Sequence, residues 1–198
     1  LADGKQRFAS SLLSSLSDEI EGYLGVGAQY YTGADSAAYG MRRLAPGEPL
    51  LVCVVRGETA ELILLGQGGV LGYATLPLGL GTVLRTLRSH GGMSEAETLS
   101  ALNLANHPYT PAYEPLEASA RHFVEEFAGA AQHLLTGGSA SGIFVIAPPA
   151  AGDWFARTLG GDESLGEYFP QGGVVRALRT SHLAPHVASH LASPDLHL

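Results

Sequence analysis

The side chains best suited to bind a metal lie near the C-terminus. His182, His186 and His190 are four residues apart, so on one uninterrupted helix their imidazoles would line one face and could share a Zn²⁺ ion. Pro185 lies among them and hampers such a helix, because proline disrupts a helix interior. A polar tail over residues 182–198 is therefore the favoured interpretation, and the three histidines are the alternative metal ligands.

A turn that could hold phosphate is the second candidate site. Gly57, Glu58 and Thr59 separate two apolar runs, and consecutive backbone amides in such a turn can cradle a phosphate. Arg56, just before them, could supply positive charge to an anion. The same residues also suit an ordinary hairpin turn with a solvated arginine, which is the interpretation that the sequence favours.

Two pairs of glutamates could act as an acid and a base, but each has another explanation. The first pair is Glu95 and Glu97. Glu97 follows Ser94 at the spacing of a capping box, in which the two residues hydrogen-bond to each other's backbone amides at the start of a helix, so Glu97 already has a structural role. Glu125 and Glu126 are adjacent on an expected helix and point in different directions. The sequence therefore does not predict acid–base catalysis by either pair.

The composition limits the classes of protein to which the chain can belong. Its 198 residues include 11 basic and 19 acidic side chains, a net charge of −8, which argues against nucleic-acid binding. Cys53, the only cysteine, lies in an apolar run and is expected to be buried rather than nucleophilic. The lack of a disulfide framework suits a cytoplasmic protein. Apolar stretches fall short of the roughly 20 residues of a membrane span.

Hydrophobic periodicity predicts a mixed α/β (α+β) fold. Apolar positions at steps of three and four predict helices over residues 8–24, 37–44, 82–89, 95–104, 115–135 and 153–159. Continuous apolar runs predict strands over residues 50–55, 60–65, 70–76, 143–147 and 174–178. The first three strands, joined by glycine turns, are expected to form an antiparallel meander. Six consecutive apolar residues in the first strand predict burial on both of its faces.

Two further expectations concern the segments around these elements. Gly79-Leu80-Gly81 is expected to be a turn, and residues 160–173 are expected to be a loop. Trp154 and Phe155, with Tyr168 and Phe169, are expected to join an aromatic core rather than an exposed patch for a partner.

The order of features over residues 50–104 resembles a known family. An apolar strand, the Gly57-Glu58-Thr59 turn and a second strand are followed by Leu76-Pro77-Leu78-Gly79, a helix and Glu95-Ala96-Glu97. This order resembles the second phosphate-loop hairpin of the actin-like ATPase superfamily, above all the FtsA and PilM group of cell division and type IV pilus assembly. The resemblance implies an actin-like (ribonuclease H-like) subdomain over residues 1–181, with a meander, parallel strands and flanking helices. It also implies half of a larger domain, which fits a chain that begins without methionine.

The departures from this family concern its nucleotide site. The family's pattern has an aspartate that positions metal and water at the phosphates, and here Val54 or Val55 stands in its place. Arg56 replaces a small residue beside it. After the late strand the family has paired glycines that admit adenosine, whereas this chain has Pro148-Pro149. The resemblance therefore implies an actin-like protein that is degenerate at its nucleotide site and holds no cofactor.

These features together predict a non-catalytic scaffold that binds other proteins in a pilus or cell-division assembly. Such a protein would be cytoplasmic, peripheral at the inner membrane and without contact with nucleic acid, with a homo-oligomer left open. The first alternative is an ATPase that binds ATP and Mg²⁺, with its missing half supplied by a longer chain or a partner. The second is a structural module whose fold carries no functional information.

Overall fold

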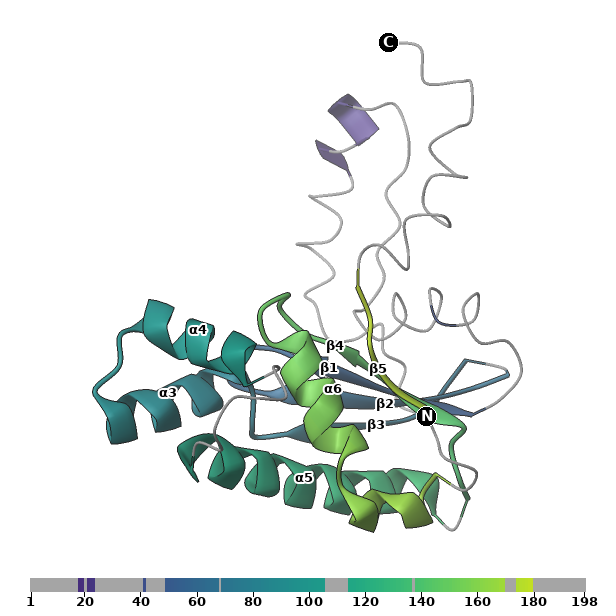
Figure 1. Cartoon of the computed structure of the whole chain (residues 1–198). Coiled ribbons are helices and arrows are strands. Elements are labelled where there is room, and N and C mark those ends of the chain that lie inside the picture. Colours follow the sequence, from purple (N-terminus) through teal and green to yellow (C-terminus); the bar gives the residue numbers. More distant parts are fainter. Residues whose placement is uncertain are drawn as a thin grey trace. The chain divides into compact units, whose positions relative to one another are not determined.

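The computed structural model describes residues 18–19, 21–23, 41, 49–67, 69–105, 114–136, 138–169 and 174–179 of the chain (Figure 1). The contacts between residues divide the chain into two compact units, residues 1–37 and 38–198. Of the helix expected over residues 8–24, Asp18–Glu19 and Glu21–Tyr23 are described and helical, and of the helix expected over residues 37–44 only Met41 is described. The rest of both helices and the histidine-rich tail lie outside the described residues. The following paragraphs concern the second unit.

A five-stranded mixed sheet forms the centre of this unit, with the strand order β3-β2-β1-β4-β5. Its strands are β1 (Leu50–Val55), β2 (Ala60–Gly66), β3 (Gly69–Leu76), β4 (Gly142–Ile146) and β5 (Val174–Ala177). β1 pairs antiparallel with β2 and β2 with β3, which confirms the expected meander. β4 lies parallel to both β1 and β5. The mixed α/β class that the sequence predicted is therefore confirmed.

The central strand is buried on both faces, as its unbroken apolar sequence predicts. Leu51 and Cys53 belong to the main hydrophobic core, whereas Val52 lies on the opposite face of the sheet. All three side chains are fully buried, and so is Ile63, which is paired with Val52 in β2. A polar substitution at these positions would therefore place an unpaired polar group inside the protein.

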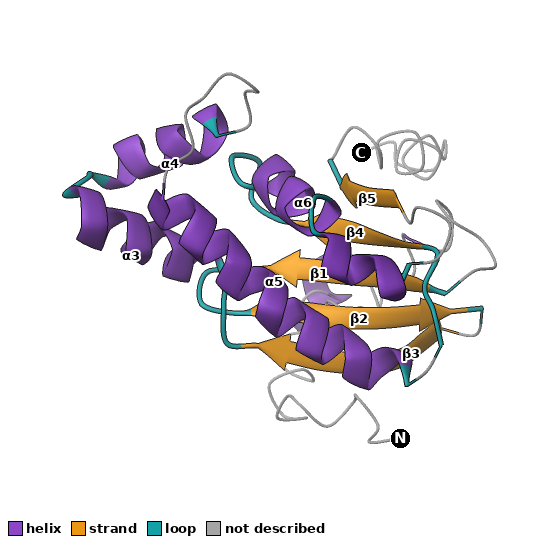
Figure 2. Cartoon of the chain, turned by 60° about the horizontal axis from the view of Figure 1, so that its bottom comes forward, coloured by secondary structure: helices purple, strands orange, loops and turns teal. Residues whose placement is uncertain are grey.

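The helices are α3 (Leu80–Gly91), α4 (Glu95–Leu104), α5 (Glu114–Leu135) and α6 (Gly152–Gly160), followed by the 3₁₀ helix η2 (Glu163–Glu167). α5 contacts β2 and β3, and α6 contacts β4 and β5, so the two helices share one face of the sheet (Figure 2). α3 and α4 form a helical hairpin connected by residues 92–94, and α3 also packs against α5. Gly92 ends α3 in the left-handed conformation, with φ of +61°.

Aromatic side chains hold α5 and α6 together above the sheet. The ring of Phe155 lies 4.8 Å from those of both Phe123 and Trp154, measured between centroids. Trp154 and Phe169 are each 6% exposed, and Tyr168 packs against the same core. The expectation that these aromatic residues form core is therefore confirmed.

The sequence prediction was wrong in two places. Leu80 and Gly81, expected within a turn, already belong to α3, because backbone carbonyls of a distant turn accept their amide hydrogens. Residues 163–167, expected as loop, form η2, because the Asp162 side chain caps the amide of Ser164. Within the ranges that the structure describes, no helix is long and apolar enough to cross a membrane.

Candidate functional site

The turn between β1 and β2 lies at the edge of the sheet where ligands bind in open α/β folds. β1 and β4 run parallel, so their carboxyl ends share one edge, and β3 ends there too because Leu76 pairs with Ala60. Both α3 and α6 begin just after strands that end at this edge. Carboxyl ends of parallel strands, followed by helix N-termini, are the usual place for phosphate-containing ligands. The candidate residues Gly57, Glu58 and Thr59 are therefore well placed for chemistry.

The backbone of this turn is bonded to the first turn of α3. The carbonyl of Arg56 accepts a hydrogen bond of 2.8 Å from the Leu80 amide, and the carbonyl of Gly57 accepts one of 2.5 Å from the Gly81 amide. A further bond of 2.8 Å, from the Arg56 amide to the Thr59 carbonyl, closes the turn itself. Two of the amides at the start of α3 that an anion would need are therefore already used.

Two glycines allow this close contact. A Cβ at Gly79 would lie 2.6 Å from the carbonyl oxygens of both Arg56 and Gly57, and 2.7 Å from the Thr59 nitrogen. A Cβ at Gly81 would lie 2.6 Å from Oε1 of Glu58. Any larger residue would push α3 away from the turn, so these glycines serve packing rather than backbone freedom.

Glu58 adds a side-chain link to the same helix. Its two carboxylate oxygens accept hydrogen bonds of 2.7 Å from Nη1 and Nη2 of Arg85. Nη2 also lies 3.3 Å from Oγ1 of Thr82. The hydrogen bond with Arg85 lowers the pKa of the Glu58 carboxyl, and the same bond raises the pKa of Arg85. This pair could not be predicted from the sequence, because the two residues lie 27 positions apart and no local pattern joins them.

Two further groups at this edge, Arg56 and the Pro148-Pro149 segment, also form contacts within the chain. Arg56 is exposed and lies 3.3 Å from Glu61, which agrees with its expected role as a solvated turn residue. After β4, the Pro148 carbonyl accepts hydrogen bonds from the amides of Ala151, at 2.9 Å, and Gly152, at 3.1 Å. Pro148-Pro149 therefore forms the turn that starts α6.

A cavity of about 370 Å³ lies between α5 and α6. Arg121 and Arg157 line it with Trp154, and Arg157 donates a hydrogen bond of 2.8 Å to the Ala105 carbonyl at the end of α4. Two guanidinium groups beside an indole could hold a flat or anionic group. This cavity could not be predicted from the sequence, because its residues come from α5, α6 and the end of α4.

The remaining candidates from the sequence take structural positions where they are described. Cys53 is fully buried, and burial raises the pKa of its thiol from 9.0 to about 12, so it is no nucleophile at neutral pH. Glu97 forms the expected capping box with Ser94, and the Ser94 amide and hydroxyl lower the pKa of its carboxyl. His182, His186 and His190 lie outside the described residues. Among those that are described, no three metal-binding side chains gather in one place.

Comparison with known proteins identifies the fold. No protein-family model and no curated protein matches the chain. PilM in a PilM-PilN type IV pilus biogenesis complex aligns with a TM-score of 0.53 and 15% identity, over 68% of this chain and 41% of that chain. ParM aligns with a TM-score of 0.47 and 12% identity, over 70% of this chain and 38% of ParM. An archaeal actin homolog, Ta0583, aligns with a TM-score of 0.45 and 14% identity, over 78% of this chain and 50% of the homolog.

The chain therefore has the actin-like fold, with PilM as a structural relative. It spans about two fifths of the PilM chain, so the activity and partners of a whole protein of that kind do not follow from the match. The order of elements that suggested this fold from the sequence is confirmed. The fold alone does not assign a function to the chain, because one fold can support many functions.

Proposed function

We propose that this protein is a non-catalytic actin-like scaffold that binds other proteins in a membrane-associated assembly, of the kind that builds type IV pili or divides the cell. The observation that carries the proposal is the contact between the β1–β2 turn and α3. Arg56 and Gly57 direct carbonyl oxygens at the first amides of α3, and Glu58 places a carboxylate over Gly81. A phosphate approaching α3 would meet two carbonyl oxygens and a carboxylate that is already paired with Arg85, instead of free amides.

The residues in the place of the family's metal-organising aspartate support the same conclusion. Val55 is 4% exposed and belongs to the hydrophobic core, and Val54 is partly buried. Neither side chain can hold Mg²⁺ or orient its water, and phosphoryl transfer depends on a metal that neutralises the developing charge. A scaffold role needs the fold and its surface but not this chemistry.

Protein partners are the second part of the proposal. The structural relative PilM was solved in a complex with PilN for type IV pilus biogenesis. A chain with a similar fold and a poorly equipped nucleotide site would serve such an assembly through its surface. Affinity capture from membranes of the source cells, with this chain as bait, is expected to enrich pilus or division proteins. Recovery of neither group would contradict the choice of assembly.

A titration with MgATP tests the absence of catalysis. A ligand at 100 times its Kd raises the free energy of unfolding by roughly 2.7 kcal/mol, a shift that thermal unfolding resolves easily. We expect no shift with MgATP and no release of phosphate. A saturable shift that EDTA removes would overturn the scaffold proposal and support the ATPase alternative.

The alternative, an ATP-binding protein completed by a longer chain or a partner, is favoured by one observation. The cavity between α5 and α6 holds Arg121, Arg157 and Trp154, and arginine planes stack well on bases. Under this alternative, Arg121→Met and Arg157→Met would both abolish the MgATP shift. Under the scaffold proposal there is no shift for these substitutions to remove.

A further inference from the structure

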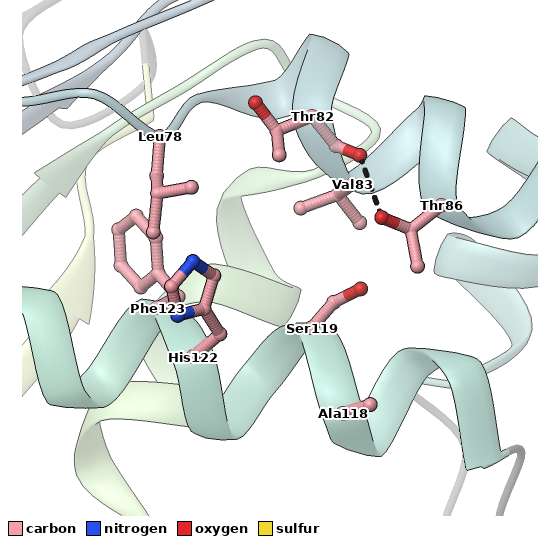
Figure 3. Close-up of a pocket in the computed structure, with 8 residues that line it drawn as sticks. All are labelled: Leu78, Thr82, Val83, Thr86, Ala118, Ser119, His122 and Phe123. Atoms are coloured by element: carbon pink, nitrogen blue, oxygen red, sulfur yellow. Dashed lines mark hydrogen bonds between the residues drawn. The ribbon is translucent and has the colours of Figure 1, made fainter.

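A second cavity, of about 180 Å³, lies between α3 and α5 (Figure 3). Leu78, Val83 and Phe123 form its apolar part and are 8%, 4% and 1% exposed. Phe123 is held in place by Phe155, whose ring centroid lies 4.8 Å away. The apolar end of the cavity is therefore part of the packed core, on the side of α5 opposite to Arg121 and Val124.

The size of this space suits one ring. An apolar cavity of about 150 Å³ in another protein binds benzene, so a cavity of 180 Å³ can accept one six-membered or fused aromatic ring. A larger ligand would have to project into solvent beyond Ala118, which is exposed at the rim. None of the lining residues is Asp, Glu, Lys or Arg, so the site has no fixed charge to hold an ion.

Two hydroxyl groups of the cavity, those of Thr86 and Ser119, favour a ligand that donates a hydrogen bond. The Thr86 hydroxyl donates its proton to the Thr82 carbonyl, at 3.0 Å, as the dashed line in Figure 3 shows. The Ser119 hydroxyl donates to the Pro115 carbonyl, at 2.8 Å. Because both protons are used within their own helices, each oxygen presents only lone pairs to a ligand. The imidazole of His122, which lies between Phe123 and Ser119 in Figure 3, can donate or accept.

We propose that this cavity binds one aromatic ring that carries a hydrogen-bond donor, an indole or a phenol. The ring would lie against Leu78, Val83 and Phe123, and its N–H or O–H would donate to Thr86 or Ser119. The same chemistry is present in a free small molecule and in a Trp or Tyr side chain of a partner protein, which are frequent anchors of interfaces. Phosphates and carboxylates would face the lone pairs of Thr86 and Ser119 and no Lys or Arg among the lining residues, so we expect benzoate to bind more weakly than phenol.

This inference is independent of the proposed scaffold function, because it concerns neither the β1–β2 turn nor nucleotide binding. Its test compares ligands that differ only in the donor. Indole and indene have nearly the same shape, but only indole has an N–H. In a two-dimensional NMR titration of the ¹⁵N-labelled chain, we expect indole to shift the amide signals of Thr86, Ser119 and Phe123 in a saturable way. Indene should bind about fivefold more weakly, the usual value of one neutral hydrogen bond.

Two variants distinguish this site from unspecific binding. The double variant Thr86→Val and Ser119→Ala removes both hydroxyl acceptors and should reduce the preference for indole while indene still binds. Ala118→Leu should block both ligands, because its side chain extends from the rim of the cavity. Glu117→Leu, at the exposed neighbouring position on α5 and outside the cavity, is the matched control and should bind both ligands normally. Circular dichroism of each variant checks that it is folded.

N-acetyltryptophanamide separates the two sources of the ring. Binding at least as tight as that of indole indicates a side chain of a partner, whereas exclusion of this larger ligand with retention of indole indicates a free small molecule. Either result supports the site. The proposal is overturned if indole gives no saturable shifts, if indene binds as tightly as indole, or if benzoate binds more tightly than phenol.

Discussion

Glu58 in the β1–β2 turn and Arg85 in α3 form a two-pronged ion pair, in which both carboxylate oxygens accept bonds of 2.7 Å from the guanidinium. The pair lies beside the two backbone bonds that join the same turn to the first turn of α3. A turn at the carboxyl edge of an open α/β sheet is well placed to face a phosphate, and here its acidic side chain forms an ion pair with Arg85 of the same chain. The relationship therefore links the local geometry to the proposed loss of nucleotide chemistry.

The pH dependence of this pair can be predicted. Arg85 lowers the pKa of the Glu58 carboxyl in the folded state, so the pair stabilises the protein above the ordinary pKa of glutamate. This stabilisation is lost as the pH falls through the lowered folded pKa. Both side chains are exposed, so solvent screening keeps the effect small. In Arg85→Met, NMR titration should show the Glu58 pKa returning towards its usual value.

Arg88→Met is the matched control for this titration, because Arg88 is exposed on the same helix and is not part of the pair. It should leave the Glu58 pKa low. An unchanged pKa in Arg85→Met would mean that the carboxylate binds elsewhere in solution.

Packing of α3 on the turn predicts a strong effect at Gly79. A Cβ there would lie 2.6–2.7 Å from three backbone atoms, which cannot swing away as a flexible side chain could. Gly79→Ala should therefore lower the free energy of unfolding by about 1–3 kcal/mol, the usual range for overpacking. At Gly57 a Cβ meets no atom within 4 Å, so Gly57→Ala is a matched control with little effect. Urea unfolding measures both, and equal values would contradict the close contact.

Leu51 and Gly79 differ in how much of their environment could be predicted from the sequence. The apolar run around Leu51 predicted a buried strand, because alternating faces and hydrophobic burial are local properties of the chain. The contact that requires glycine at position 79 is not visible in the sequence, because Arg56 and Thr59 are about 20 positions away and lie beside Gly79 only in the folded chain. Because the sequence shows only residues that favour a turn at this point, the helix was predicted to begin at residue 82, whereas α3 begins at Leu80.

Candidate sites were harder to predict than elements for the same reason. The capping box of Ser94 and Glu97 was predicted because its partners are three residues apart. The Glu58–Arg85 pair and the two cavities join residues from separate elements, and their formation depends on how the helices pack. The turn at Gly57, Glu58 and Thr59 was therefore a candidate from the sequence, but its contacts with Arg85 and the first turn of α3 were not.

The aromatic core predicts a large effect at Phe155. This ring is fully buried and contacts both Phe123 and Trp154, so its removal leaves a cavity between α5 and α6. Phe155→Ala should lower the free energy of unfolding by about 3–5 kcal/mol in urea. Leu71→Ala, at a side chain that is 61% exposed, should change it by less than about 0.5 kcal/mol. Similar values for the two variants would contradict the described core.

The capping box predicts a measurable effect at Ser94. The Ser94 hydroxyl accepts a hydrogen bond from the Glu97 amide, at 3.3 Å, and the Glu97 carboxylate accepts one from the Ser94 amide, at 2.8 Å. Ser94→Ala should lower the free energy of unfolding by about 1 kcal/mol. Ser100→Ala, at an exposed position inside α4, should be neutral or slightly stabilising, because alanine is the better helix former. Urea unfolding of the two variants decides between a cap and a solvated serine.

Burial of Cys53 predicts both its reactivity and a pH effect. Burial raises the pKa of the thiol from 9.0 to about 12, so the folded state keeps the proton while an unfolded chain loses it above pH 9. The unfolded chain then binds fewer protons, so the free energy of unfolding should fall as the pH rises past 9.

A thiol reagent at neutral pH should modify Cys53 at least about a thousandfold more slowly in native protein than in urea, because the reaction requires the protein to open. A cysteine introduced at exposed Ser89, in a Cys53→Ala background, should react rapidly in both states. Fast modification of native Cys53 would show that β1 is open to solvent and would contradict its central place in the sheet.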